Sequence, residues 1–206
     1  MRTLVAFLEE PSAAVFLKTV LLPLLPPDWT LKCISFEGKQ DLEKNLERKL
    51  RGWINPDSSF IVMRDRDSED CRLVKKRLVD ICRRAERPQT IVRIACGELE
   101  SFYLGDLDAV SKALDCRVPS NRQAKFRDPD RLNNAADELK RLTRGTYQKI
   151  SGSRMIGPYL KTDGTNRSHS FNVLLDGVRR LVASFQQTED VDKTHGSNHK
   201  MECVRY

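Results

Sequence analysis

Short apolar runs alternate with amphipathic segments through the first hundred residues, and this alternation restricts the fold more than any other feature. Four apolar runs have the length of buried strands: residues 3–8, 30–36, 60–63 and 90–95. Three segments between them have apolar side chains at helical spacing: residues 12–25, 40–53 and 68–85. Because strands that alternate with helices favour a parallel sheet covered by helices, we predict an α/β fold.

The chain changes character after residue 114. Residues 115–130 are polar and contain two prolines, and further helices are expected over 131–143, 153–161 and 170–187. From Gln186 onward the chain is polar and lacks apolar periodicity. We therefore predict three parts, which are an α/β core (1–114), a basic loop and C-terminal helical extension that packs on it (115–187), and a flexible tail (188–206).

Positive charge is concentrated in one region of the chain. The net charge is +7, and residues 117–168 account for all of it, with 12 Lys and Arg against 5 Asp and Glu. A regional excess of this kind is a candidate footprint for a polyanion such as nucleic acid. Its commoner meaning is an ordinary solvated surface, and both interpretations stay open.

The spacing of the cysteines and the length of the apolar runs bear on where in the cell the protein resides. The six cysteines never form C-x-x-C and lack zinc-site spacing. The run TVLLPLLPP is too short to span a bilayer, and the N-terminal segment has no cleavage site of the secretory type. We expect reduced thiols in a cytoplasmic protein with no membrane segment.

The stretch FIVMRDRDSED, residues 60–70, places two carboxylates directly after an apolar strand. Residues i and i+2 of an extended segment point to the same side. We therefore expect Asp65 and Asp67 to face one way, with Arg64 and Arg66 facing the other. Neighbouring anions repel each other, so solvent, arginine partners or a divalent cation must stabilise them.

Acidic residues follow three of the four predicted strands, namely Glu9 and Glu10, Asp65 and Asp67, and Glu98 and Glu100. In a parallel sheet these positions share the carboxyl edge, where ligands bind near a topological switch point. Oxygen ligands without nearby His or Cys suit Mg²⁺ or Mn²⁺. Taken singly, each cluster has a simpler explanation: an arginine-neutralised surface for D-x-D, or helix N-terminal acids for the glutamates.

Four segments resemble a bacterial family of Toprim-like proteins, domain of unknown function 4276: LEEPSAAVFLKTVLLPLL, FIVMRDRDSEDC, IACGELESFYLGDLDAV and YQKISGSRMIGPYL…SHSF. The resemblance runs from about Thr3 to about Phe185. It extends to Toprim nucleases of the overcoming-lysogenization-defect (OLD) type, and it implies a Toprim-like, Rossmann-like sheet.

The resemblance implies a metal-dependent nuclease that acts on phosphodiesters, with Mg²⁺ or Mn²⁺ as cofactor. It carries over Glu9, Asp65 and Asp67 as catalytic, metal-binding acids, with Glu98 and Glu100 as further ligands. Toprim domains commonly have glycine after the first glutamate, whereas this chain has Glu10 followed by Pro11. We take Glu9 as the ligand or base, although Glu10 is the alternative.

Two partners follow from the same reasoning. Lys149, Arg154 and Lys161 lie in the basic region and within the resemblance, so we expect them to contact the nucleic-acid backbone; ordinary solvated charge is the alternative. The family is associated with ATPases in defence-like contexts, which implies an ATPase partner subunit. The competing function is a non-catalytic, Toprim-like binding subunit of such an ATPase complex.

Overall fold

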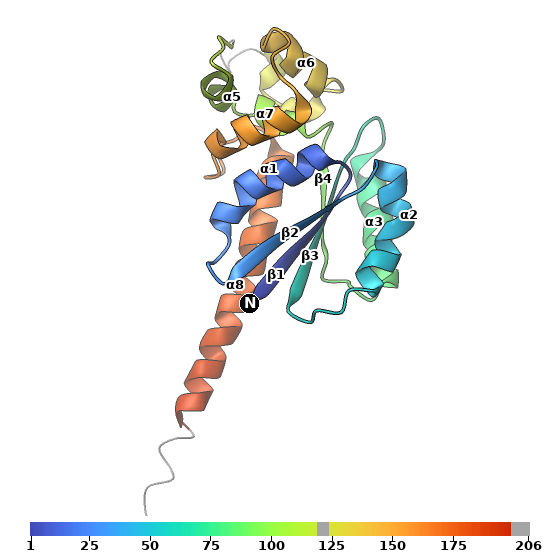
Figure 1. The fold of residues 1–206 in the computed structure, drawn as a ribbon, viewed down its shortest axis with the longest axis vertical. Coiled ribbons are helices and arrows are strands. Elements are labelled where there is room, and N and C mark those ends of the chain that lie inside the picture. The colour runs from blue at the N-terminus through green and yellow to red at the C-terminus, as the bar shows by residue number, and fades with distance from the viewer. Residues whose placement is uncertain (119–123, 199–206) are drawn as a thin grey trace, which may run out of the picture.

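Four parallel strands form a sheet in the order β2–β1–β3–β4 (Figure 1). They are β1 (Arg2–Leu8), β2 (Trp29–Ser35), β3 (Ser58–Asp65) and β4 (Ile91–Ala95). The computed structural model describes residues 1–118 and 124–198, with side chains up to residue 187. The predicted parallel sheet is confirmed, and β1 and β3 are neighbours.

The register of the sheet brings the carboxyl ends of β1, β3 and β4 to one edge. Leu8, the last residue of β1, pairs with Met63, and Asp65, the last residue of β3, pairs with Ala95. Because β2 and β3 lie on opposite sides of β1, the chain reverses its direction across the sheet there. Ligands of open α/β sheets bind beside such a switch point, so the residues directly after β1 and β3 are well placed for binding.

Helices cover both faces of the sheet. α2 (Lys39–Arg51) and α3 (Cys71–Arg84) lie on one face, and α1 (Pro11–Leu21) and α8 (His169–Asn198) lie on the other (Figure 1). On the α2–α3 face, strand residues such as Phe7 and Val62 pack with Leu46 and Leu78 of the helices. Successive strand residues point to opposite faces of the sheet, and both faces are covered by apolar side chains. The strands therefore appear as continuous apolar runs in the sequence.

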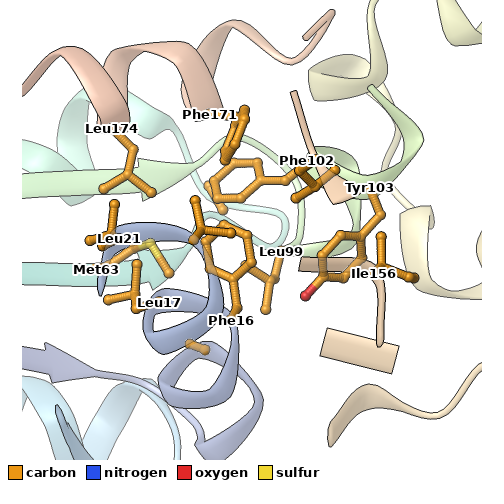
Figure 2. Packing of buried hydrophobic residues seen from close by; sticks show 14 of the residues in the cluster. Phe16, Leu17, Leu21, Met63, Leu99, Phe102, Tyr103, Ile156, Phe171 and Leu174 are labelled. Carbon is orange, nitrogen blue, oxygen red and sulfur yellow. The ribbon is translucent and has the colours of Figure 1, made fainter. Parts of the chain in front are cut away.

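An aromatic cluster joins three helices on the opposite face. Phe16 of α1, Phe102 of α4 (Glu100–Leu104) and Phe171 of α8 have ring centroids 5.4 to 6.1 Å apart (Figure 2). All three rings are buried together with Met63 from the sheet. The cluster fixes the start of α4 and the start of α8 against α1, and so positions the loop after β4 at the carboxyl edge.

The remaining helices gather at the end of the molecule to which the strands point (Figure 1). They are α5 (Leu107–Leu114), α6 (Ala135–Leu142) and α7 (Lys149–Ile156), with 3₁₀ turns at Leu22–Leu24, Ala124–Phe126, Pro129–Arg131 and Gly157–Tyr159. A Cβ atom added at Gly157 would lie 2.0 Å from the Thr19 hydroxyl oxygen. The missing side chain thus lets the end of α7 approach α1 closely.

Several helix boundaries differ from the predicted ones. α1 ends at Leu21 because Pro23 removes a backbone donor from the next turn. α7 begins at Lys149, before the predicted start, and ends at Ile156, where Gly157 and Pro158 follow it. α8 was expected to end near residue 187 but continues to Asn198, so residues 188–198 of the predicted tail are helical. Residues 199–206 lie outside the described part of the chain, and the three-part division remains a prediction.

No helix in the described ranges is long and apolar enough to cross a membrane.

Candidate functional site

Acidic side chains from the ends of β1 and β3 meet at the carboxyl edge. A carboxylate oxygen of Glu9, Oε2, accepts a hydrogen bond from the backbone N–H of Asp65 at 3.0 Å. Glu10 occupies the position before the first turn of α1, where it accepts a hydrogen bond from the Ser12 hydroxyl. The Glu9 carboxylate thus lies beside the backbone of Asp65, and its charge acts on the Asp65 carboxyl group.

Glu100 enters the same region from the first turn of α4 and is fully buried. Its Oε1 accepts a 2.8 Å hydrogen bond from the Tyr147 hydroxyl. Its Oε2 is buried and has no hydrogen-bond partner among the residues that the structure describes. Burial raises the pKa of Glu100, and the Tyr147 hydrogen bond and the Lys149 charge only partly oppose this effect.

The Asp65 carboxyl group is affected both by burial and by its acidic neighbours. Burial raises its pKa well above the ordinary value, and the charges of Glu100, Glu9 and Glu10 raise it further in that order. The pKa of Glu9 is also raised, chiefly by burial, despite the Asp65 N–H and the nearby Arg64 guanidinium. Neighbouring acids thus disfavour the ionisation of Asp65 and of Glu9, as expected where carboxylates share a site.

Lys149 supplies positive charge to this group of acids. Its Nζ, at the start of α7, lies 3.0 and 3.2 Å from the two carboxylate oxygens of Glu10. The hydrogen bond to Glu10 and the charges of Glu100 and Asp65 together hold the pKa of Lys149 above its ordinary value, although burial opposes them. About half of the Lys149 side chain is exposed, so it can also contact a ligand.

Asp67 does not share the surroundings of Asp65, and the expectation that they face the same way is wrong. β3 ends at Asp65, and Asp67 has a positive φ of 55°, so the two-residue alternation of a strand does not extend this far. The Asp67 carboxylate accepts a 2.8 Å hydrogen bond from Lys39 and lies 3.8 Å from Arg64. Its charge still raises the pKa of Glu9.

Arg64 is fully buried on the α2–α3 side of the sheet, where it contacts acids from several elements. It donates hydrogen bonds to Glu43 and, at 2.8 Å, to Glu69, and its Nε lies 3.8 Å from Glu9. Arg77 also binds Glu69, and these two arginines hold the pKa of Glu69 down to about 2. Arg64, directly before the D-x-D, therefore links an ion-pair network to the edge of the acidic site.

Glu98 serves as a helix cap in this structure. Its Oε2 accepts a 2.7 Å hydrogen bond from the backbone N–H of Ala136 in the first turn of α6. Gly97 before it has a φ of 102°, and a Cβ there would lie 2.8 Å from the Leu132 carbonyl oxygen. The tight turn thus directs Glu98 toward α6 and Glu100 toward Asp65.

Lys161 and Arg154, the other predicted nucleic-acid contacts, have different surroundings from Lys149. Lys161 lies 3.3 Å from Asp108 and 3.9 Å from Asp106 of the neighbouring α5 region. Arg154 is exposed on α7. The structure thus brings Lys149 to the acids but gives Lys161 different partners.

Sequence reasoning missed how Tyr147 and Glu10 are used. Tyr147 is fully buried, and its hydroxyl donates a hydrogen bond to Glu100. Glu10 was considered only as an alternative to Glu9, whereas here it holds Lys149. No local pattern marks these pairings, because each joins residues more than forty positions apart.

The donor set fits a hard divalent cation in its chemistry. Glu9, Asp65 and Glu100 offer only oxygen ligands, and the free Oε2 of Glu100 is an orphaned buried acceptor. Within the described residues, however, no three His, Cys, Asp or Glu side chains are arranged closely enough to hold a metal ion. Cation binding would therefore require the carboxylates to draw closer together.

Comparisons with known proteins give the family. The family model for "Domain of unknown function (DUF4276)" matches residues 8–179. The C-terminal region of the Burkholderia pseudomallei OLD protein shares the fold with a TM-score of 0.50 and 17% identity, over 87% of this chain and 98% of that one.

The C-terminal region of the Xanthomonas campestris pv. campestris OLD protein gives a TM-score of 0.49 and 16% identity, over 89% of this chain and 97% of that one. No curated protein sequence matches this chain. The sheet, its helices and the family match agree with a Toprim-like α/β fold. The chain belongs to the DUF4276 family.

Proposed function

We propose that this protein is a divalent-metal-dependent, Toprim-type nuclease that cleaves phosphodiesters of nucleic acid. The supporting observation is the meeting of Glu9, Asp65 and Glu100 beside the switch point of the sheet, each with a raised pKa. Buried like charges destabilise a fold unless a counter-ion is bound. Such a costly arrangement is typical of functional sites.

Glu9, Asp65 and Glu100 would hold Mg²⁺ or Mn²⁺ in this proposal. Asp67 and Glu98 stay in the proposed ligand set, but each would first have to leave its present partner, Lys39 or Ala136. The bound cation would neutralise phosphoryl charge and lower the pKa of water.

The chain's own residues would position the substrate and move the proton. If Glu9 is not a direct ligand of the cation, it would instead accept the proton of the attacking water, because its raised pKa makes it a better base than an ordinary carboxylate. Lys149, half-exposed beside Glu10, would contact a phosphate oxygen at the same edge. Arg154 and Lys161 would contact the backbone farther along.

A second function, a non-catalytic binding subunit of an ATPase complex, has its own support. Two acids of the site already have cationic partners, Glu10 with Lys149 and Asp67 with Lys39. An intrinsic cation can make a bound metal unnecessary for stability. The ATPase partner and a role in bacterial defence come from the family resemblance, and they are part of the proposal.

A cleavage assay tests the proposed function. Purified protein is incubated with plasmid and with single-stranded DNA or RNA, with Mn²⁺, Mg²⁺ or a chelator. We expect cleavage that needs the cation and is lost in Asp65→Asn but kept in the exposed control Asp57→Asn. Comparing Glu9→Gln with Glu10→Gln identifies the essential glutamate. If the wild type cleaves none of these substrates with either cation, the binding-subunit function is favoured instead.

A further inference from the structure

Two thiols meet next to the acidic site, and the proposed function uses neither of them. Cys71 is the first residue of α3, and Cys96 directly follows β4. Their Sγ atoms lie 2.8 Å apart, and both residues are partly exposed. A disulfide needs an S–S distance of about 2.05 Å, so only a small approach separates this pair from a bond.

The two thiols are accessible from a small cavity. A pocket of about 170 Å³ is lined by Cys71 and Cys96 together with the basic side chains of Arg72 and Lys75. Positive charge at its wall attracts anionic thiol compounds, while burial and the neighbouring Cys71 thiol raise the pKa of Cys96 to about 12. The pocket therefore gives a small anionic disulfide access to the pair.

The pair also joins the two loops that carry the acids. The backbone N–H groups of Arg66 and Asp67, in the loop after β3, donate to the carbonyl oxygens of Ala95 and Gly97 at 2.9 and 3.1 Å. A covalent bond between Cys71 and Cys96 would add a fixed link beside these two hydrogen bonds. Opening of the β3 loop away from the β4 loop would then be restrained.

We propose that Cys71 and Cys96 form a reversible dithiol–disulfide site that is oxidised by a small-molecule disulfide of the glutathione type. One protein thiolate attacks a sulfur of the oxidant and expels one of its thiolates, which leaves a mixed disulfide. The second protein thiolate attacks this mixed disulfide and expels the other thiolate. The protein thiols lose two protons and two electrons, and the oxidant gains the electrons as it becomes two thiols.

Peptide mapping tests whether the bond forms. Reduced protein is treated with oxidised glutathione, blocked with an alkylating reagent and digested with trypsin. We expect peptide 67–72 joined to peptide 94–112, with the loss of two hydrogen atoms, and release of the link by a reductant. Cys116→Ser, a partly exposed control, should form the same link. A lasting glutathione adduct on either cysteine, or no product at these two positions, would overturn the proposal.

Hydrogen exchange tests the restraint without any assay of activity. Oxidation should slow exchange of the Arg66 and Asp67 amides at least several-fold and raise the thermal midpoint by about 5 °C, because the link constrains the unfolded chain. Neither effect should occur in Cys71→Ser or Cys96→Ser. Equal exchange in the oxidised and reduced wild type, with the link verified by mass, would show that the disulfide does not fasten the loops.

Discussion

Asp65 ends β3 among other carboxylates, and its ionisation is opposed by burial and by their charges. Its folded-state pKa lies above the ordinary value of 3.8, so the folded protein binds more protons than the unfolded one between these two values. The stabilising contribution of the protonated group is therefore complete at low pH and is lost as pH rises through the folded-state pKa.

Because ionised Asp65 destabilises the fold at high pH, the Asp65→Asn substitution has a predictable effect on stability. The amide cannot ionise but can still accept a backbone hydrogen bond, so the variant should be more stable than the wild type at pH 8, by about 1–2 kcal/mol. The gain should shrink toward pH 4. Urea unfolding at both pH values measures it, with the exposed Asp57→Asn as control. A variant that is less stable at pH 8 would show that Asp65 makes favourable ionic contacts.

For the D-x-D pair, the position of Asp65 could be predicted from the sequence, but the direction of Asp67 could not. Its place after a buried strand correctly indicated that Asp65 would lie at the carboxyl edge near Glu9. The shared direction of Asp65 and Asp67 could not be predicted, because it depends on the positive φ of Asp67 and on Lys39, which is distant in sequence. Likewise, nothing local marks Glu98 as a cap for α6.

Elements of the α/β core were predictable because their signals are local. Buried strands and amphipathic helices show their periods within single segments, and the parallel order follows from their alternation. The segment before α7 was less predictable, since the position of Tyr147 depends on tertiary contacts. Its hydroxyl connects this segment to Glu100 of α4.

Tyr147→Phe tests that connection between elements. The substitution removes the donor to Glu100 Oε1 and leaves both oxygens of a buried carboxyl without a partner. We expect a loss of about 1–3 kcal/mol of unfolding free energy. Tyr159→Phe, at a ring that is 44% exposed, should change stability by less than about 0.5 kcal/mol. Equal effects of the two substitutions would contradict the role assigned to the Tyr147 hydroxyl.

α8 illustrates a boundary that periodicity alone misplaces. Its apolar contacts reach Phe185, whose ring lies 5.5 Å from that of Trp29 and 4.0 Å from the guanidinium of Arg2. The predicted end at residue 187 lies just past this ring, whereas the helix continues to Asn198.

Truncation after Gln187 tests whether residues beyond this position stabilise the core. The cut keeps Phe185 and its contacts, so the thermal midpoint should stay within about 2 °C of the wild-type value. Phe185→Ala in the full chain should instead lower it by at least about 4 °C, because that change removes the contacts of a partly buried ring with Trp29 and Arg2. Thermal unfolding followed by circular dichroism measures both. A large drop on truncation would show that residues beyond 187 stabilise the core.

On the scale of the whole molecule, the carboxyl edge of the sheet has two sides that differ in how well their acids are neutralised by cations. On the α2–α3 side, Arg64 and Arg77 neutralise their acids, and the pKa of Glu69 is held at about 2. On the α1–α4 side, Asp65 and Glu100 have raised pKa values. One side is thus already neutralised, whereas the other is short of positive charge and suits an added cation.

Calorimetric titration of Mn²⁺ into the protein tests this claim most directly. We expect saturable binding by the wild type and by Asp57→Asn, and at least tenfold weaker binding by Asp65→Asn. Wild-type binding should be weaker at pH 6 than at pH 8, because bound cations compete with protons for carboxylates. If the wild type binds no Mn²⁺ at pH 8, or if Asp65→Asn binds it as tightly as the wild type, these carboxylates do not form a cation site.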